Sequence, residues 1–206
     1  MVTIEVPPSI ASSFTTPGQF IKLKSESQPK PSFFAIASPP NANKNTLTFM
    51  IKQAASNDFV LNAPSSVKLQ MSAALGSGFK IDEFFNKYKN DFPTINVILL
   101  ACGTGIAPIA SVIESNALGL KTVSYTSLME RTATLYYGVR TPKHLLFEDR
   151  FSSWESLGIK IVPVISRLDD EKSKGWTGRT GYIQDSLKMD GVRVPRNSGA
   201  LLCGQR

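Results

Sequence analysis

The sequence predicts two consecutive domains, an antiparallel β domain over residues 1–93 and a doubly wound parallel α/β domain over residues 94–206. The first part consists of short segments that alternate apolar and polar residues, separated by proline, asparagine and serine clusters. The second part consists of nearly continuous apolar strands that alternate with helical patterns. A length of 206 residues is compatible with this division. The antiparallel strands suit either a small barrel or a sandwich.

Each strand expected in the first domain is a short segment bounded by turn residues. These strands cover residues 3–6, 18–24, 33–37, 46–52 and 67–71. The first of them starts almost at the first residue, so we expect that a strand preceding it is missing from this chain.

The second domain begins with an almost entirely apolar strand, which is typical of a strand buried on both faces of a parallel sheet. The expected strands are 95–102, 133–139, 160–166 and 200–203, and the expected helices begin near Ile109, cover 142–157 and cover 183–187. A doubly wound sheet usually has a further helix after such a last strand. We therefore expect a C-terminal helix that is missing or disordered beyond Arg206.

Composition excludes several classes of protein. The longest apolar run, residues 97–102, is far shorter than a membrane helix, and the start of the chain lacks a signal-peptide pattern. Two cysteines and one histidine argue against a disulfide framework and a zinc site, and the absence of G-x-S-x-G argues against a serine hydrolase. We expect a soluble intracellular protein, of the cytoplasm or plastid stroma, with no metal and no membrane span.

The net charge of +7 does not identify a partner by itself. A basic balance suits nucleic acid, an anionic cofactor or an acidic protein. Because lysines and arginines are spread along the chain without a run of like charges, we do not expect nucleic-acid binding.

The segment Gly103-Thr-Gly-Ile-Ala-Pro108 lies between a buried strand and a helix, where α/β folds bind phosphate. Glycines allow a tight turn and close approach to a pyrophosphate, and a proline is tolerated in the first helical turn. The acidic residue that usually holds the ribose hydroxyl is absent, because the second strand is followed by Arg140. Two glycines after a strand are also compatible with a purely structural turn.

Four further motifs accompany this turn: F-x-A-I-A-S-P-P at 33–40, Y-G-V-R at 137–140, Ser166-Arg167 and Cys203-Gly204. With them, the chain resembles the ferredoxin–NADP⁺ reductase superfamily of flavin-dependent NAD(P)H oxidoreductases, and within it the plant and algal fruit-protein type. The resemblance implies an FAD-binding antiparallel β-barrel followed by an NAD(P)-binding domain. It also implies hydride transfer between nicotinamide and flavin N5, and electron transfer to an unidentified acceptor, for which a small redox protein is one candidate.

The resemblance implies a set of flavin-binding residues in the first domain. They are Phe34, Ala35, Ile36, Ser38, Lys52, Ser56, Gly76 and Gly78. The usual phosphate-binding arginine is Ser32 here, the stacking tyrosine is Phe34, and the serine near flavin N5 is Ala35. A phenylalanine ring can still stack, and Lys30 or Lys52 is available to replace the arginine. These departures leave FMN open beside FAD. They also motivate an alternative function, a nucleotide-binding module or pseudoenzyme without productive flavin chemistry.

The resemblance implies a second set of residues that bind the nicotinamide nucleotide. They are Gly103, Thr104, Gly105, Pro108, Arg140, Ser166, Arg167, Tyr182 and Gly204, with Cys203 as the catalytic residue that orients the nicotinamide. For Cys203 the alternative is a small buried strand residue, and Cys102 is expected only to pack. Because Ser166, Arg167, Arg179 and Tyr182 suit a 2′-phosphate, the sequence favours NADPH. NADH stays open as the alternative, since Arg167 is also compatible with an exposed cation at the end of a strand.

Three other features have simpler interpretations. We expect His144 to be exposed in the first turn of its helix, Trp176 to anchor a loop, and the acidic run 169–171 to be a solvated turn.

Overall fold

The computed structural model describes residues 1–26, 28–41, 43–64, 66–81, 83, 94–120, 130–168 and 173–204. The chain forms two compact units, one of Met1–Lys80 with Ala107–Ser115 and one of Ile81–Ile106 with Asn116–Arg206. The predicted domain boundary between residues 93 and 94 falls at the end of segment 84–93, outside the described residues, and stays a prediction. The acidic run 169–171 also lies outside the described residues.

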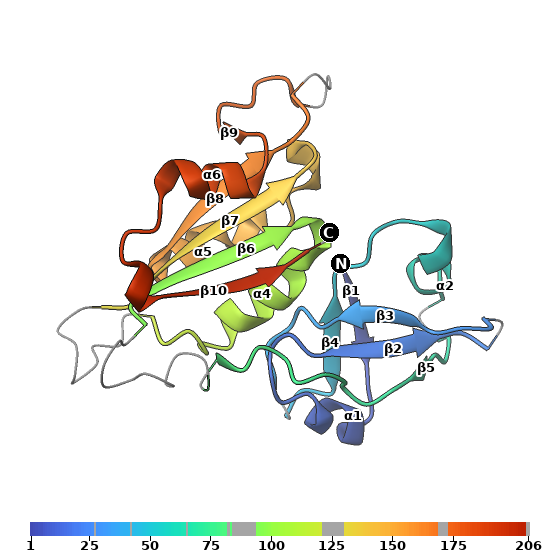
Figure 1. Cartoon of the computed structure of the whole chain (residues 1–206). Helices are drawn as coiled ribbons and strands as arrows, with labels where there is room; N and C mark the ends of the chain where they lie inside the picture. Colours follow the sequence, from blue (N-terminus) through green and yellow to red (C-terminus); the bar gives the residue numbers. More distant parts are fainter. Residues whose placement is uncertain are drawn as a thin grey trace. The chain divides into compact units, whose positions relative to one another are not determined.

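The first unit contains antiparallel sheets built from short strands (Figure 1). The strands are β1 (Val2–Glu5), β2 (Phe20–Lys24), β3 (Ser32–Ala35), β4 (Thr46–Phe49) and β5 (Gln70–Met71). β1 pairs with β4, and β2 pairs with both β3 and β5. A single bridge between Ile36 and Phe49 connects the two sheets. Among the described residues no ladder joins β5 to β1, so closure of these strands into a barrel stays a prediction.

The core of the first unit follows the alternation of its strands. Ile21 and Leu23 of β2 are fully buried, whereas Lys22 between them is exposed. β3 is in register with β2 so that Phe34 lies opposite Ile21 and Phe33 lies opposite Lys22. Since paired residues share a face of the sheet, Phe34 enters the core and Phe33 faces outward.

The first unit also contains short helices that the sequence did not predict. They are α1 (Pro8–Ser13), the 3₁₀ turn η1 (Ala55–Asn57) and α2 (Asp58–Leu61). Pro8 occupies the first turn of α1, where its fixed φ suits a helix and its missing N–H costs nothing. A helix of six residues buries only Ala11 fully, so it is too short to display a helical period in the sequence.

Helix α4 (Ile106–Glu114) begins in the second unit, and all but its first residue belong to the first. The hydroxyl of Ser111, which is fully buried, donates a hydrogen bond of 2.8 Å to the carbonyl of Ser38 just after β3. This bond attaches α4 to the antiparallel unit.

The second unit is a five-stranded parallel sheet in the order β10-β6-β7-β8-β9 (Figure 1). Its strands are β6 (Asn96–Cys102), β7 (Thr132–Val139), β8 (Ile159–Ile165), β9 (Arg179–Thr180) and β10 (Ser198–Cys203). The predicted parallel α/β organisation is therefore confirmed. Only β9 was not predicted, because its two residues follow a polar loop and carry no apolar pattern.

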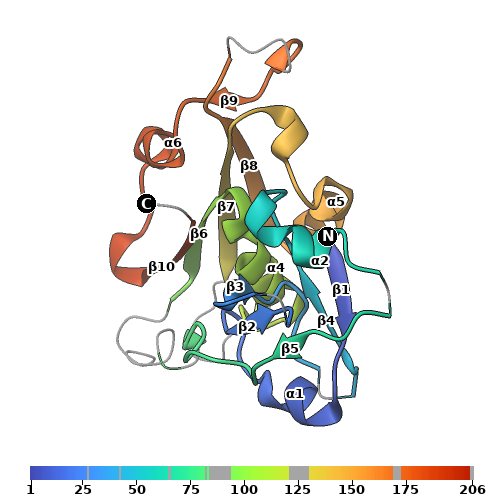
Figure 2. The same cartoon turned by 90° about the vertical axis from the view of Figure 1, so that its right-hand side faces the viewer.

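Helices cover both faces of this sheet. Figure 2 shows α6 (Ile183–Asp190) on one side and α5 (Glu148–Ser156) on the other. The described residues of this unit also form the short 3₁₀ segments η2 (Gly103–Gly105), η3 (Pro142–His144) and η5 (Pro195–Asn197). Across the described residues, no helix is both long and apolar enough to cross a membrane.

The prediction of one continuous helix over 142–157 was wrong. The chain makes the turn η3, leaves helical geometry at Leu145, and enters α5 through Phe147 in a left-handed conformation with φ of 62°. The ring of Phe147 is buried against Trp154, with centroids 5.8 Å apart. Burial of this ring therefore offsets the cost of the unusual backbone. His144 is exposed as expected, but it lies in the 3₁₀ turn.

Candidate functional site

The order of the parallel strands reverses at β6, inside the sheet. From β6 the chain proceeds to β7 and β8 on one side, whereas β10 lies on the other side of β6. Ligands of open α/β sheets bind at such a switch point, beyond the carboxyl ends of the strands. The turn η2 leaves β6 at this point, so Gly103–Gly105 lies where the sequence predicted a phosphate-binding turn.

The two glycines of this turn are needed for different reasons. Gly103 has φ of 55°, and a Cβ atom placed on it would meet nothing within 4 Å. Gly105 is buried, and a Cβ atom there would collide with the carbonyl of Cys203. Gly105 thus allows the turn to lie close to β10. Gly103 instead borders open space, next to the exposed Thr104.

The end of β10 packs closely against the end of β6. A Cβ atom on Gly204 would lie 2.7 Å from the Cβ atom of Cys102. Cys203 is in register with Ala101, so its side chain lies on the opposite face of the sheet from Cys102. Both cysteines are free and half-buried, and burial raises the pKa of each thiol. Both are therefore protonated at neutral pH, and the orienting role of Cys203 stays a prediction.

Three predicted nucleotide-binding residues come together at the carboxyl ends of β7 and β8. Arg140, Ser166 and Arg167 are all exposed. The backbone N–H of Arg167 donates to the carbonyl of Arg140, and that of Ser166 donates to the carbonyl of Val139. These hydrogen bonds hold Arg140 and Arg167 on neighbouring segments, just beyond the carboxyl ends of β7 and β8. Neither arginine side chain has a hydrogen-bond or ion-pair partner among the described residues.

Tyr182 follows at the same edge, at the amino end of α6. It is the N-cap residue of this helix, and its side chain is 61% exposed. The preceding Gly181 donates its N–H to the carbonyl of Ile165, the last residue of β8. The amino end of α6 is therefore attached directly to the strand that carries Ser166 and Arg167.

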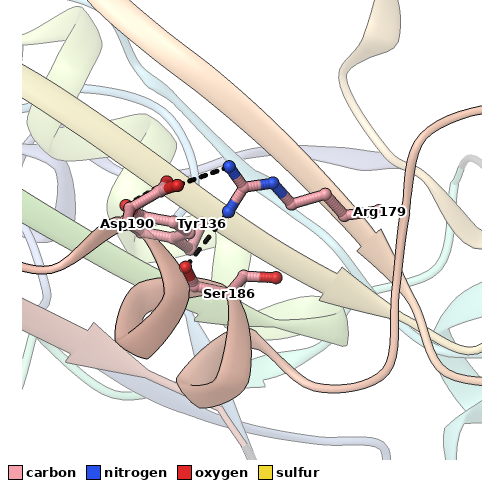
Figure 3. A network of polar contacts seen from close by, with 4 residues as sticks. All are labelled: Tyr136, Arg179, Ser186 and Asp190. Atoms are coloured by element: carbon pink, nitrogen blue, oxygen red, sulfur yellow. Dashed lines mark hydrogen bonds and ion pairs between the residues drawn. The ribbon is translucent and has the colours of Figure 1, made fainter.

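Arg179 does not join this set, contrary to the sequence-based expectation. Its guanidinium donates 2.6 Å and 3.1 Å hydrogen bonds to the Asp190 carboxylate and the Ser186 carbonyl, both on α6 (Figure 3). The other oxygen of Asp190 accepts a 2.8 Å hydrogen bond from the hydroxyl of Tyr136 on β7. The guanidinium therefore already has a protein carboxylate as its partner.

Asp190 and Tyr136 were not predicted as functional residues, although two signals in the sequence pointed to them. Asp190 is the last residue of α6, where a carboxylate opposes the helix dipole and requires a compensating cation. Tyr136 lies in a buried strand, where a tyrosine hydroxyl usually finds a partner. Burial, the largest cause, and the hydrogen bond to Asp190 raise the pKa of Tyr136 to about 12, so its hydroxyl remains a donor.

The loop between β8 and β9 is attached at both described ends. The buried Ser173 donates its hydroxyl proton to the carbonyl of Arg167. The indole N–H of Trp176 donates a 3.0 Å hydrogen bond to the carbonyl of Arg179, and its ring occupies the space beside Gly178. Trp176 therefore anchors this loop, as the sequence suggested.

In the first unit, the predicted flavin-stacking residue is a core residue. The ring of Phe34 is only 8% exposed and lies 6.4 Å and 6.5 Å, between centroids, from the rings of Phe49 and Phe59. Its neighbour Phe33 is 62% exposed, and the Nζ atom of Lys22 lies 5.6 Å from its centroid. The described structure thus offers Phe33, rather than Phe34, as an open aromatic surface.

The other predicted flavin contacts differ in how accessible they are. Ala35 is half-buried, and Ile36 is fully buried in the core. The hydroxyl of Ser38 accepts a 3.2 Å hydrogen bond from the N–H of Thr48. Lys52, which precedes the turn η1, and Ser56, which lies within it, are both exposed. Only these last two side chains are both polar and open to a ligand.

Gly76 and Gly78 are explained by the local backbone. Both have positive φ, of 82° and 64°. A Cβ atom on Gly76 would lie 3.0 Å from the ring of Phe20, and one on Gly78 would lie 2.6 Å from the carbonyl of Pro17. These contacts require glycine with or without a flavin.

Pro108 is the third residue of α4, as expected for a proline in a first turn.

Comparison with known proteins supports the same family. Residues 99–206 match the family described as the oxidoreductase NAD-binding domain. The chain is 27% identical over 214 residues to the fruit protein pKIWI502 of Actinidia deliciosa, covering 99% of this chain and 62% of that protein. It is 25% identical over 160 residues to an NAD(P)H-flavin reductase of Aliivibrio fischeri, covering 76% of this chain and 61% of that protein. The chain thus spans less than two thirds of either relative.

A solved structure shares the fold over nearly the whole chain. It is a ferredoxin NADP⁺ reductase from Neisseria gonorrhoeae with bound FAD and NADP, with a TM-score of 0.66 and 18% identity over 97% of this chain and 76% of that chain. The family match, the parallel sheet and the glycine turn at its switch point agree with one another. The chain belongs to the oxidoreductase NAD-binding domain family.

Proposed function

We propose that this chain forms the flavin- and nucleotide-binding part of an NAD(P)H oxidoreductase. The observation that carries the proposal is the turn Gly103–Gly105 at the switch point of the parallel sheet, beside the exposed Arg140 and Arg167. A glycine turn that leads into a helix offers backbone N–H groups and a positive dipole end to a pyrophosphate. The name of the related NAD(P)H-flavin reductase agrees with this activity.

The nucleotide is held by the carboxyl edge of the parallel sheet. Open space beside Gly103 admits the pyrophosphate, because no protein atom lies where a side chain would be. Arg140 and Arg167 supply positive charge further along the same edge, and the exposed ring of Tyr182 supplies a surface on which an adenine can stack. Charge-assisted hydrogen bonds from these arginines favour the 2′-phosphate of NADPH over the 2′-hydroxyl of NADH.

The flavin is held by the antiparallel unit. The exposed Lys52 and Ser56 are proposed to contact its phosphates. Their turn is held by a 2.9 Å hydrogen bond from the side chain of Asn57 to the carbonyl of Lys52. Ser32 replaces a guanidinium, and loss of such a charged hydrogen bond weakens binding by about 1.5–3 kcal/mol. We therefore propose that FAD binds loosely. A bound flavin would supply the chemistry of hydride acceptance and onward electron transfer.

The protein residues in this scheme bind and orient the two rings rather than transfer protons. Orientation alone supplies much of the rate in such reactions. Cys203, a neutral half-buried thiol at the end of β10, is proposed to pack beside the nicotinamide. The acceptor is proposed to be a separate redox partner, in keeping with the reductases among the relatives.

Titration of the purified chain with FAD tests the flavin site. We expect weak binding by the natural chain and binding tighter by about tenfold to hundredfold in Ser32→Arg, the gain expected for a charged hydrogen bond. Ser9→Arg on the exposed start of α1 adds the same charge elsewhere and serves as the matched control. A chain that binds NADPH but no FAD in any variant would instead identify a nucleotide-binding module.

A further inference from the structure

A polar network spans the second unit behind the proposed nucleotide site. Figure 3 shows the guanidinium of Arg179 reaching from β9 along α6, between the carbonyl of Ser186 and the carboxylate of Asp190. Tyr136, from the central strand β7, donates to the second oxygen of the same carboxylate. The network therefore joins the central strand β7 to the edge strand β9 and the covering helix α6, which follow it forty or more residues later in the sequence.

This network fixes the carboxyl end of α6, while a backbone hydrogen bond fixes the amino end. The N–H of Gly181 is held by the carbonyl of Ile165, next to Ser166. Arg179 is only two residues before Gly181 and contacts Asp190 at the far end of the helix. Rotation or sliding of α6 would break one attachment or the other. The orientation of the N-cap residue Tyr182 relative to Ser166 and Arg167 is thereby determined.

Stability alone does not require such a network. The side chains of Arg179 and Asp190 are 30% and 24% exposed, and ion pairs that reach solvent contribute little to stability. A carboxylate at the last position of a helix is unfavourable by itself. The side of α6 that faces the sheet already packs Ile183 and Leu187 against an apolar cluster with Val162. The polar contacts add a specific geometry to this packing.

We propose that Tyr136, Asp190 and Arg179 are positioning residues that set the affinity for the nicotinamide nucleotide. They act through α6, which presents Tyr182 beside Ser166 and Arg167. This inference rests on the proposed function, because the proposed function assigns the nucleotide to the carboxyl edge of the parallel sheet. None of the three side chains contacts the nucleotide in this account.

The test compares nucleotide affinity with stability in single variants of the full chain. Tyr136→Phe removes only the hydroxyl, and Asp190→Asn removes the charge while keeping the shape. We expect each to raise the dissociation constant of NADPH, measured by fluorescence titration, about threefold to tenfold, in the range typical of residues that act at a distance. Asp190→Glu, which restores the carboxylate, should recover part of the affinity.

Arg131→Lys is the matched control, because Arg131 also fixes two segments at the opposite, amino end of the sheet. Its guanidinium donates hydrogen bonds of 2.8 Å and 2.7 Å to the carbonyls of Thr94 and Leu118. This variant should lower the melting temperature and leave the dissociation constant of NADPH unchanged. That difference separates positioning from general stability.

Two results would overturn the inference while leaving the proposed function intact. One is unchanged NADPH affinity in Tyr136→Phe and Asp190→Asn, although the natural chain binds NADPH. The other is an equal loss of affinity in Arg131→Lys. Failure of the natural chain to bind either NADPH or NADH would overturn the proposed function and this inference together.

Discussion

Three glycines meet at the carboxyl ends of β6 and β10, and they lack side chains for two different reasons. Gly105 and Gly204 allow the backbones of the two strands to approach, because a Cβ atom on either would collide with the other strand. Gly103 meets no such obstacle and is required by its positive φ alone. Of the three, Gly103 therefore borders the space proposed for the pyrophosphate.

Substitutions in this turn should separate stability from nucleotide binding. Gly105→Ala places a methyl group against the carbonyl of Cys203, and we expect it to lower the free energy of unfolding by about 1–3 kcal/mol. Gly103→Asn keeps the left-handed conformation, which asparagine tolerates, and should leave stability nearly unchanged. Its side chain occupies the open space, so NADPH binding should fall.

Denaturant unfolding and NADPH titration of both variants check this. Full NADPH affinity in Gly103→Asn would show that the turn is purely structural. Unchanged unfolding of Gly105→Ala would show that β10 does not pack on it as described.

Arg167 carries the predicted preference between the two nicotinamide nucleotides. Arg167→Ala should weaken binding of NADPH by about 1.5–3 kcal/mol, roughly tenfold to hundredfold, because a charge-assisted hydrogen bond to the 2′-phosphate is lost. Binding of NADH should hardly change. Arg193→Ala, at an exposed arginine just after α6, is the control for net charge. Equal losses for both nucleotides would remove the basis for NADP specificity.

The connection between β7 and α5 is determined by one buried ring rather than by helix propensity. Phe147 adopts φ of 62°, and its ring packs on Trp154 while the guanidinium of Arg150 lies 4.8 Å from its centroid. A continuous helix would have satisfied the local pattern. It would not have brought the connection back onto this face of the sheet with the ring inside.

Phe147→Gly tests which of these two effects is larger. Glycine relieves about 1–2 kcal/mol of left-handed strain, but removing a buried phenylalanine ring costs about 3–5 kcal/mol. We therefore expect net destabilisation in denaturant unfolding. Asn116→Gly, at an exposed residue with φ of 59°, relieves similar strain without loss of packing and should not destabilise. A stabilised Phe147→Gly variant would contradict this explanation of the break.

In both units, the buried strands were predictable from the sequence. Elements of only a few residues, and side-chain positions that depend on tertiary contacts, were not. β6, β7 and β8 were predicted within one residue of their ends, because strands buried on both faces are almost entirely apolar. α1 and β9 were missed because so few residues carry no period. The glycine turn was predictable because a single segment forms it.

Two site residues show why the rest of the candidate site could not be read from the sequence. The face of Phe34 depends on its register with Ile21 in β2, which no local pattern fixes. The partner of Arg179 lies eleven residues away on α6, and only the packing of this helix brings Asp190 to the guanidinium. Both depend on tertiary contacts. The family resemblance suggested a ligand for Phe34, and sequence position suggested one for Arg179, whereas each side chain contacts protein groups in the structure.

Anaerobic reduction of the flavin-loaded full chain tests the central claim most directly. The chain is saturated with FAD, freed of oxygen and titrated with NADPH while the yellow flavin absorbance is followed. The proposed function predicts that NADPH bleaches the absorbance, and that NADH does so less effectively. Protein-bound flavin that stays oxidised in the presence of both nucleotides would contradict the account.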